Sequence, residues 1–283
     1  MAEIKLKLKK SLDFPLEAES ITPDNFAGKS NDEIKKLVVY SGNEESTLGQ
    51  FFTVSGKSGE KDELKIIIDG DVSNVKRIGE KMTVGEIIIN SDVGMHVGNE
   101  MSGGKITVNG NADDWAGAML NGGELEINGD AGNYVGAAYR GYWKGMKNGI
   151  IKVKGKVGVE SMLWADGSVP AKRFPTLICG SAGSFLGIHN HGGTVIVEGD
   201  VDRCAGADQV KGMIIVKGKA PKILPSFKKI GEVKEIELLN GEKITGKFVE
   251  YAGDHSVKKN HSVVSKKTGE LNKGVNGRLY IAA

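Results

Sequence analysis

Apolar residues recur with a 19-residue period between residues 65 and 231. Within a period they fall at positions 2, 4, 8, 12 and 16, as Ile106, Val108, Ala112, Ala116 and Leu120 do in the copy that begins at Lys105. A spacing of two predicts a β-strand, because alternate side chains of a strand face the same side. Five 19-residue copies begin at Glu86, Lys105, Pro175, Thr194 and Met213, and three longer copies begin at Lys65, Glu124 and Ile150.

Glycine separates the strands from the rest of each copy. Position 6 is glycine in seven of the eight copies, with Ser91 as the exception, and position 19 is glycine in seven. Because glycine alone adopts a positive φ without strain, we expect positions 6 and 19 to form corners of the chain. The predicted structural corners are Gly70, Gly110, Gly129, Gly155, Gly180, Gly199 and Gly218.

A short strand between two corners cannot bury its apolar face alone, but copies stacked roughly 4.8 Å apart form a continuous core. The sequence therefore predicts an all-β fold, a right-handed parallel β-helix of about eight 19-residue coils with N- and C-terminal caps. A left-handed hexapeptide helix would repeat its apolar positions every six residues, and these do not. Asn90, Asn109 and Asn128 share position 5, where they either form a hydrogen-bonded ladder between coils or simply suit a turn.

Residues 1–64 form the expected N-terminal cap of the β-helix at 65–231. Ile4–Leu8 alternates charge and leucine like a strand, and Ser30–Glu33 has the sequence of a helix capping box. Apolar runs follow at Leu37–Tyr40 and Phe51–Val54. Capping is needed because an open end of stacked strands invites aggregation.

Residues 232–283 form the expected C-terminal part, a hairpin followed by an extended arm. Glu235–Leu239 and Lys243–Val249 flank Asn240-Gly241, a pair typical of tight hairpin turns. Residues 252–277 lack periodicity and hold the basic pairs Lys258-Lys259 and Lys266-Lys267. Such an arm is usually mobile or bound to a partner.

Composition excludes several classes of function. With 38 basic and 36 acidic side chains, the net charge of +2 is too balanced for a nucleic-acid surface. No apolar run approaches the ~20 residues that span a bilayer, and the alternating N-terminus is unlike a signal peptide. Two cysteines supply neither a disulfide framework nor an iron–sulfur cluster, so we expect a cytoplasmic protein with no cofactor in this chain.

Few residues have the spacing that catalysis or metal binding needs. His189 and His191 could face one side of a strand, but no further ligand is spaced to complete a metal site. Cys179 and Cys204 have no paired base. A polysaccharide-acting β-helix enzyme, the alternative of another class, would need clustered acids, whereas the acids at position 7 suit the turn itself. These acids are Asp71, Asp92, Asp130 and Asp200.

Two insertions concentrate aromatic residues in a chain that is only 6% aromatic. Solenoid loops on one face are commonly a binding surface, and aromatic, Arg and Met side chains are enriched at interface hot spots. We therefore expect contacts with other subunits here, the alternative being that the loops cover the rod's own apolar side chains. The candidate interface residues are Tyr139, Arg140, Tyr142, Trp143, Met162, Trp164, Arg173 and Phe174.

The whole chain resembles the C subunit of formylmethanofuran dehydrogenase, the enzyme of methanogenic archaea that fixes carbon dioxide as a formyl group on methanofuran. The resemblance rests on the coil segments 98–104 (GNEMSGG) and 117–123 (GAMLNGG), and on 24–30 (DNFAGKS) before the coils. The same glycine-repeat β-helix is similar to the C-terminal domain of the glutamate synthase large subunit, where it is structural. No catalytic residue belongs to the shared pattern, so none is carried over.

The resemblance implies a scaffold between an amidohydrolase-like subunit and a tungsten- or molybdenum-pterin subunit. Tungsto- or molybdopterin, iron–sulfur clusters and a metal centre are then expected in partner subunits, with electrons supplied by ferredoxin-like subunits. A related C subunit occurs in a formyltransferase/hydrolase complex that lacks the redox step, and this alternative stays open. The Lys- and Ile-rich composition favours the archaeal dehydrogenase.

Overall fold

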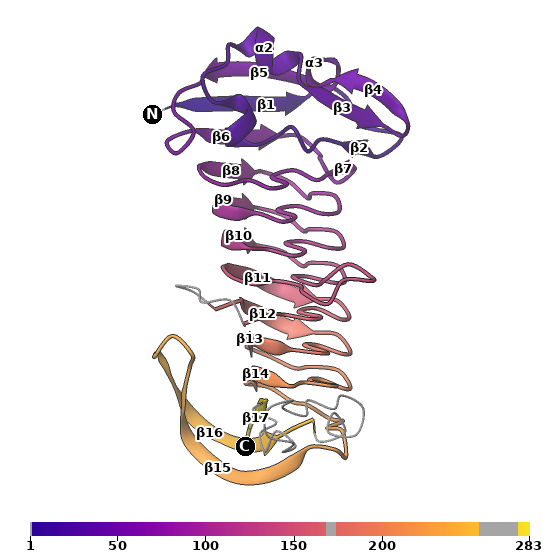
Figure 1. The fold of residues 1–283 in the computed structure, drawn as a ribbon. Coiled ribbons are helices and arrows are strands. Elements are labelled where there is room, and N and C mark those ends of the chain that lie inside the picture. The colour runs from indigo at the N-terminus through magenta and orange to yellow at the C-terminus, as the bar shows by residue number, and fades with distance from the viewer. Residues whose placement is uncertain (1, 168–173, 255–276) are drawn as a thin grey trace, which may run out of the picture.

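The computed structural model describes residues 2–167, 174–254 and 277–283, and its regular structure is mostly strands. The predicted all-β class is thus confirmed. Figure 1 shows a tall rod of stacked turns with a broader N-terminal cap at one end and a long hairpin at the other. Eight parallel strands, one from each predicted copy, follow one another along the rod. They are β6 (Lys65–Asp69), β8 (Glu86–Ile89), β9 (Ser102–Val108), β10 (Gly122–Ile127), β11 (Ile150–Val157), β12 (Thr176–Ala182), β13 (His191–Val197) and β14 (Lys211–Val216).

The repeat positions stay in register from coil to coil. Ile66, Ile87 and Ile106 are consecutive partners at position 2, one coil apart. A second row of parallel bridges joins position 8 on another side of the rod, from Val72 through Val93 and onward. The apolar residues of the repeat are buried in one continuous core, as the period predicts.

The copy assigned to Pro175 is one residue out of register in its strand. Thr176, not Pro175, pairs with Ile150 above and with Thr194 below, so Leu177 and Cys179 face the core. The register of the repeat is restored at position 8, where Ala182 forms a parallel bridge with Val201. This coil is therefore one residue shorter between its strand and its first turn.

The predicted reason for glycine at position 6 is wrong for six of the seven residues. Among them only Gly70 has a positive φ, of 101°. A Cβ at Gly155 would instead lie 2.0 Å from Asp130 Oδ1, and at Gly129 it would lie 2.3 Å from Asn111 Oδ1. Glycine is needed here because the coil above approaches too closely for a side chain. Positive angles lie instead at position 13, where Gly79, Gly98, Gly117, Gly136, Gly187 and Gly206 have φ between 61° and 74°. They also lie at position 19, where Gly85, Gly104, Gly123, Gly149 and Gly212 have φ between 77° and 91°, so the predicted corner is confirmed for five of the seven glycines there.

Side-chain ladders along the rod explain the polar residues of the repeat. The predicted Asn ladder is confirmed: Asn109 Nδ2 donates to Asn90 Oδ1 and Asn128 Nδ2 donates to Asn109 Oδ1, each at 2.8 Å. Asn90 Nδ2 continues the ladder to Asp69 Oδ1 at 2.8 Å. These bonds fix the vertical register of successive coils.

The N-terminal cap joins the rod through strands. β1 (Glu3–Leu8) pairs in parallel with β6 and antiparallel with β5 (Phe52–Lys57), which forms one edge of the 13-stranded sheet. The predicted capping box is present, because Ser30 Oγ accepts from Glu33 N and Glu33 Oε2 accepts from Ser30 N. The remaining elements are α1 (Pro23–Phe26), α2 (Asn31–Lys35), α3 (Leu48–Phe51) and a four-stranded sheet of β4 (Glu44–Thr47), β3 (Val38–Ser41), β2 (Leu16–Glu17) and β7 (Val75–Lys76).

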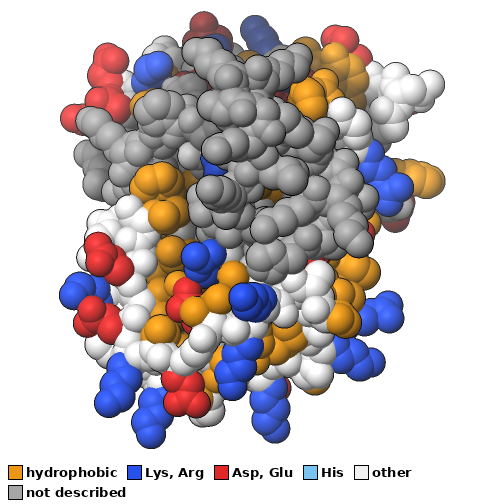
Figure 2. Space-filling view, turned by 60° about the horizontal axis from the view of Figure 1, so that its bottom comes forward, with side chains coloured by type: hydrophobic (Ala, Val, Ile, Leu, Met, Phe, Trp, Pro, Cys, Tyr) orange, Lys and Arg blue, Asp and Glu red, His pale blue; other side chains and the backbone are white. Residues whose placement is uncertain are grey.

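The predicted C-terminal hairpin is confirmed and is longer than expected. β15 (Lys228–Glu237) pairs antiparallel with β16 (Lys243–Ala252), and the final strand β17 (Arg278–Ala282) inserts between β16 and β14. The hairpin packs Ile236, Leu238 and Phe248 against the outward-facing Ile196 and Ile215 of the rod. β15 is the other edge of the sheet, and its charged sequence, with three Lys and three Glu, discourages end-to-end pairing. Figure 2 shows Lys and Arg side chains along the margin of this end.

Candidate partner-binding edge of the rod

One edge of the rod is formed by residues with left-handed backbone angles. Of the fourteen non-glycine residues with positive φ in the described chain, thirteen fall at two repeat positions. A left-handed angle costs a side-chain-bearing residue about 1–2 kcal/mol, so it persists only where something offsets it. At position 11 the angle directs the N–H to the next coil, since Trp115 N donates to Asn133 O at 2.8 Å.

We define these two lines as row 11 and row 15. Their side chains leave the rod on either side of the position-13 glycines and therefore share one edge. Row 11 holds Arg77, His96, Trp115, Tyr134, Glu160, Phe185 and Cys204, and row 15 holds Lys81, Glu100, Met119, Trp164, His189 and Asp208.

An aromatic cluster occupies the N-terminal half of this edge. Trp115 stacks on Tyr134 at a centroid distance of 4.3 Å and lies 6.2 Å from the His96 ring in row 11. Tyr139, from the first insertion, lies across them at 5.1 Å from Trp115 and 5.7 Å from His96. Stacked aromatic pairs contribute roughly 0.5–1.5 kcal/mol each, which helps to offset the backbone angles.

Hydrogen bonds hold Tyr139 in this cluster. Its hydroxyl donates to Oδ1 of the buried Asn99 at 2.7 Å and lies 3.0 Å from His96 Nδ1. Because the hydroxyl has one proton, we assign the Nδ1 proton to His96, which then donates to Tyr139. Burial, with Arg77 nearby, lowers the pKa of His96, and burial raises the pKa of Tyr139 to about 12. Both side chains are therefore neutral near pH 7.

A charged group lies beside this cluster at the first coil. Arg77 Nη1 donates to Oε2 of the buried Glu80 at 2.8 Å, and Arg77 Nε lies 3.4 Å from Glu17 of the N-terminal cap. Arg77 thus ties the cap to the rod at the top of row 11. A buried carboxylate paired in this way is strongly destabilised when its partner is removed.

A second aromatic group lies lower on row 15. Trp164 stacks on His189 at 4.2 Å and lies 5.1 Å from the His191 ring. His189 Nδ1 is 3.4 Å from Asp208 Oδ2 in the coil below. His189 and His191 are therefore brought together as the sequence predicts, but around a tryptophan ring. The described residues contain no group of three or more side chains that could hold a metal ion.

The predicted interface residues fall into different environments. Tyr142 and Trp143 are 61% and 75% exposed, and Arg140 is exposed beside them. Tyr139, Trp164 and Phe174 are partly buried, and Met162 is fully buried in the core at a position that is glycine in six other coils. Arg173 lies outside the described residues, as does most of the predicted C-terminal arm with its two lysine pairs.

The sequence reasoning missed most of row 11. His96, Trp115 and Tyr134 are 19 residues apart, and this spacing was the available signal. With them, all three tryptophans and three of the five histidines lie on rows 11 and 15 or in the segments next to them. The other two histidines, His255 and His261, lie outside the described residues.

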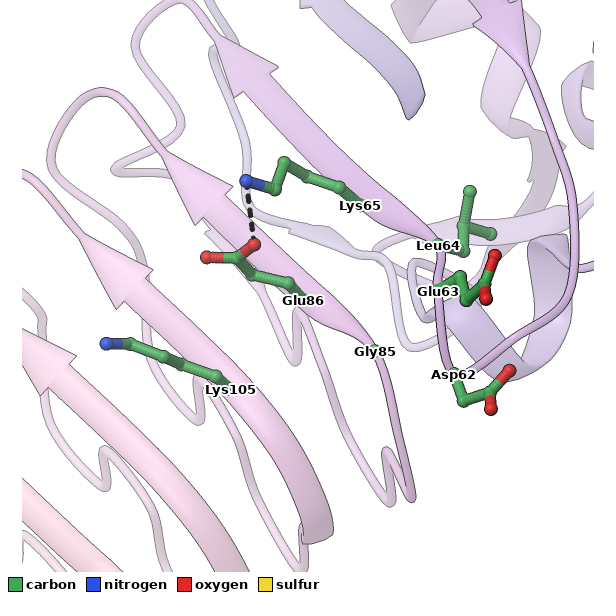
Figure 3. Close-up of a pocket in the computed structure, with 7 residues that line it drawn as sticks. All are labelled: Asp62, Glu63, Leu64, Lys65, Gly85, Glu86 and Lys105. Carbon is green, nitrogen blue, oxygen red and sulfur yellow. Dashed lines mark ion pairs between the residues drawn. The ribbon is translucent and has the colours of Figure 1, made fainter. Parts of the chain in front are cut away.

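A cavity of about 580 Å³ lies elsewhere, between the cap and the first coils. It is lined by charges of both signs: Lys65 pairs with Glu86 at 2.8 Å, and Figure 3 shows these two side chains pointing toward each other. Lys105, also in its lining, pairs with Glu126 at 3.2 Å. Asp62 and Glu63 also line the cavity, so its lining carries three carboxylates against two lysines.

The acids at position 7 serve the rod. Asp92 Oδ1 accepts from Asn111 N, Asp130 Oδ1 from Lys156 N and Asp200 Oδ1 from Lys219 N, each at 2.7 Å. Asp71 Oδ1 accepts from Ser73 N at 3.0 Å. The predicted structural role of these acids is confirmed, and the hypothesis of a polysaccharide-acting enzyme, which required them to be free in a groove, is rejected.

The two cysteines differ in environment. Cys179 faces the core at 1% exposure, and burial, with Glu198 nearby, raises the pKa of its thiol to about 12. Cys204 lies in row 11 and is partly exposed. Burial thus suppresses the thiolate of Cys179, as expected for a structural cysteine. Among the described residues, no helix has the length and apolar character to cross a membrane.

Comparison with known proteins identifies the family. The chain is 43% identical over 260 residues, 90% of its length and 93% of the relative's, to the C subunit of the tungsten-containing formylmethanofuran dehydrogenase 2 of Methanococcus maripaludis. It is 50% identical over 98 residues, 34% of its length and 33% of the relative's, to the C subunit of the molybdenum-containing formylmethanofuran dehydrogenase 1 of Methanosarcina barkeri. No protein-family model matches the sequence.

A solved structure also matches over nearly the whole chain. It is a chain of the formyltransferase/hydrolase complex from Methylorubrum extorquens in complex with methylofuran. The TM-score is 0.79 at 25% sequence identity, and the match covers 99% of both chains. Together with the near full-length similarity to the M. maripaludis protein, this shows that the chain belongs to the family of formylmethanofuran dehydrogenase C subunits.

Proposed function

We propose that this chain is a non-catalytic scaffold subunit of a formylmethanofuran dehydrogenase complex and that its rod is a right-handed parallel β-helix. The observation that carries the scaffold role is the use of polar side chains in the repeat. Three of the position-7 acids and the Asn ladder form hydrogen bonds between coils, which stiffen the rod. A stiff rod suits a subunit that holds others at fixed positions.

The proposed division of the chain follows this role. Residues 1–64 cap one end, 65–231 form the rod, and 232–283 form the C-terminal hairpin and arm. The antiparallel pairs β1–β5 at one end and β15–β16 and β16–β17 at the other support this division, because the strands from β1 to β17 pair in parallel.

We propose an amidohydrolase-like subunit, a pterin-binding catalytic subunit and ferredoxin-like subunits as partners in the cytoplasm. Pterin with tungsten or molybdenum, iron–sulfur clusters and a metal centre would be held by these partners, with none in this chain. The multi-subunit nature of the M. extorquens complex, which is named for formyl transfer and hydrolysis, supports a hetero-oligomer. The matches to dehydrogenase subunits favour the redox complex over a formyltransferase/hydrolase.

The proposed contact surface is the edge formed by rows 11 and 15 with the insertion at 139–149. Three tryptophans gathered on one edge of a rod are unusual in a chain that is 6% aromatic. Tryptophan, tyrosine and arginine are the residue types that dominate interface hot spots. We include Tyr139, Arg140, Tyr142, Trp143, Trp164 and Phe174 in this surface, and Arg173 by sequence.

Isolation of the tagged chain from its host tests the proposal. Native mass spectrometry is expected to show a hetero-oligomer, and metal analysis is expected to find tungsten or molybdenum together with iron. A hetero-oligomer without tungsten or molybdenum would favour the formyltransferase/hydrolase alternative. Recovery of the chain as a monomer would contradict the scaffold role altogether.

A further inference from the structure

The first insertion presents an exposed tryptophan at its tip. Trp143 is 75% exposed and Tyr142 is 61% exposed, whereas Trp115 and Trp164 are packed on other rings. Burying a tryptophan from this degree of exposure removes more apolar surface from water than any other side chain offers. The tip therefore has a large free-energy gain available on contact with an apolar surface.

Both stems of this insertion are fastened to the rod. On the N-terminal side, the Tyr139 ring lies tilted against Trp115 at 5.1 Å, and its hydroxyl donates to Asn99, two coils away. On the C-terminal side, Gly145 N donates to Trp164 O at 2.8 Å, and Lys144 Nζ lies 3.4 Å from Asp166 Oδ2. Tyr142 N closes a turn to Tyr139 O at 2.9 Å. An anchor held in place before binding loses less conformational entropy when it binds.

The charge of the insertion is of one sign. Residues 139–149 contain Arg140, Lys144 and Lys147 and no acidic residue, in a chain whose 283 residues carry a net charge of only +2. Lys144 is engaged with Asp166, but Arg140 is exposed next to the aromatic tip. A surface complementary to this segment is apolar at its centre and acidic at its rim.

We propose that residues 139–147 dock on a partner subunit, with Trp143 entering an apolar pocket whose rim carries carboxylates. In this arrangement Tyr139 is a positioning residue: it holds the N-terminal stem and does not enter the pocket. The proposal rests on the proposed function, because it needs a partner subunit. It differs from the sequence-based interface in placing the binding energy at the tip and a supporting role at Tyr139.

A competition experiment in the host tests the proposal. A tagged variant is expressed beside the untagged wild-type chain. The ratio of tagged to untagged chain in the high-mass fraction, divided by the same ratio in the whole extract, is a quotient that measures how well the variant competes for assembly. Trp143→Ala is expected to lower this quotient about tenfold or more relative to tagged wild type, as loss of a central anchor does. Phe14→Ala is the matched control, because Phe14 is 74% exposed on the cap, and its quotient is expected to stay at one.

Variants of the basic residues and of Tyr139 test the rim charges and the positioning role separately. Arg140→Glu with Lys147→Glu is expected to lower the quotient several-fold at about 50 mM NaCl and less at about 300 mM, because salt screens rim charges. Tyr139→Ala is expected to lower the quotient while Tyr139→Phe restores most of it, since phenylalanine keeps the ring contact with Trp115. Melting temperatures measured on the purified chains identify any variant whose rod is damaged.

The outcomes separate the two proposals. If Trp143→Ala assembles as well as Phe14→Ala, the docking proposal is wrong although the scaffold role stands. If Tyr139→Ala assembles like wild type, the positioning role is wrong. If tagged wild type never enters a high-mass fraction, the proposed function fails and the docking proposal fails with it.

Discussion

Replacing Gly155 by alanine tests the reason for glycine at position 6. A Cβ there would lie 2.0 Å from Asp130 Oδ1 and 2.9 Å from Gly129 O. Asp130 Oδ1 accepts a hydrogen bond from Lys156 N at 2.7 Å, so moving the carboxylate away breaks that bond. Losing a bond to a charged group costs about 1.5–3 kcal/mol, and overpacking adds about 1–3 kcal/mol.

We therefore expect Gly155→Ala to reduce the free energy of unfolding by about 3 kcal/mol. In a domain of this size this corresponds to a fall of roughly 6 °C or more in melting temperature, measured by circular dichroism. Gly231→Ala is the control, because a Cβ there meets nothing within 4 Å and its φ is ordinary. Its effect should stay within about 0.5 kcal/mol. Equal melting temperatures for the two variants would refute close approach as the reason.

Three smaller predictions concern the polar ladder and the titrating groups. Asn109→Ala removes both hydrogen bonds of the ladder at that coil and should cost about 1–3 kcal/mol in urea unfolding; an unchanged midpoint would reject the ladder as a stabilising feature. Because burial raises the pKa of Tyr139 to about 12, above the roughly 10 of an unfolded chain, its contribution to stability is full below pH ~10 and is lost as pH rises toward 12. Ultraviolet difference titration of wild type against Tyr139→Phe checks this, and a phenolate of Tyr139 appearing near pH ~10 in the folded protein would contradict it. A thiol reagent at pH ~8 should label Cys204 in the native protein and Cys179 only after unfolding, whereas fast native labelling of both would show that the core is open there.

Periodicity was sufficient to predict most of the fold. The apolar positions of the repeat depend only on strand alternation and stacking, and they place Ile66, Ile87 and Ile106 one above another as observed. The hairpin around Asn240-Gly241 and the Ser30 capping box follow from local chemistry, which the sequence also contains. Strand β17 could not be foreseen, because it pairs with β14, which lies more than 60 residues before it in the chain.

Glycine was the least reliable guide. A glycine is required either by a positive φ or by a close neighbour, and sequence alone does not distinguish these causes. Gly117 has a φ of 61°, whereas Gly129 is needed because Asn111 and Gly110 of the coil above lie against it. The left-handed angles of rows 11 and 15 had no such signal, because residues such as Trp115 adopt them without being glycine. The candidate interface was predicted from the aromatic insertions. Which of its residues are exposed and which are buried depends on how the insertions fold onto the rod, and the sequence does not show this.

A cryo-electron microscopy map of the complex isolated through this chain would show directly whether the rod is a scaffold whose edge of rows 11 and 15 binds the partner subunits. We expect a rod without bound cofactor, with partner density covering rows 11 and 15 and with the Trp143 side chain buried in a partner pocket. Density for a cofactor within the rod, or partners bound elsewhere while Trp143 and Trp164 face solvent, would contradict this expectation.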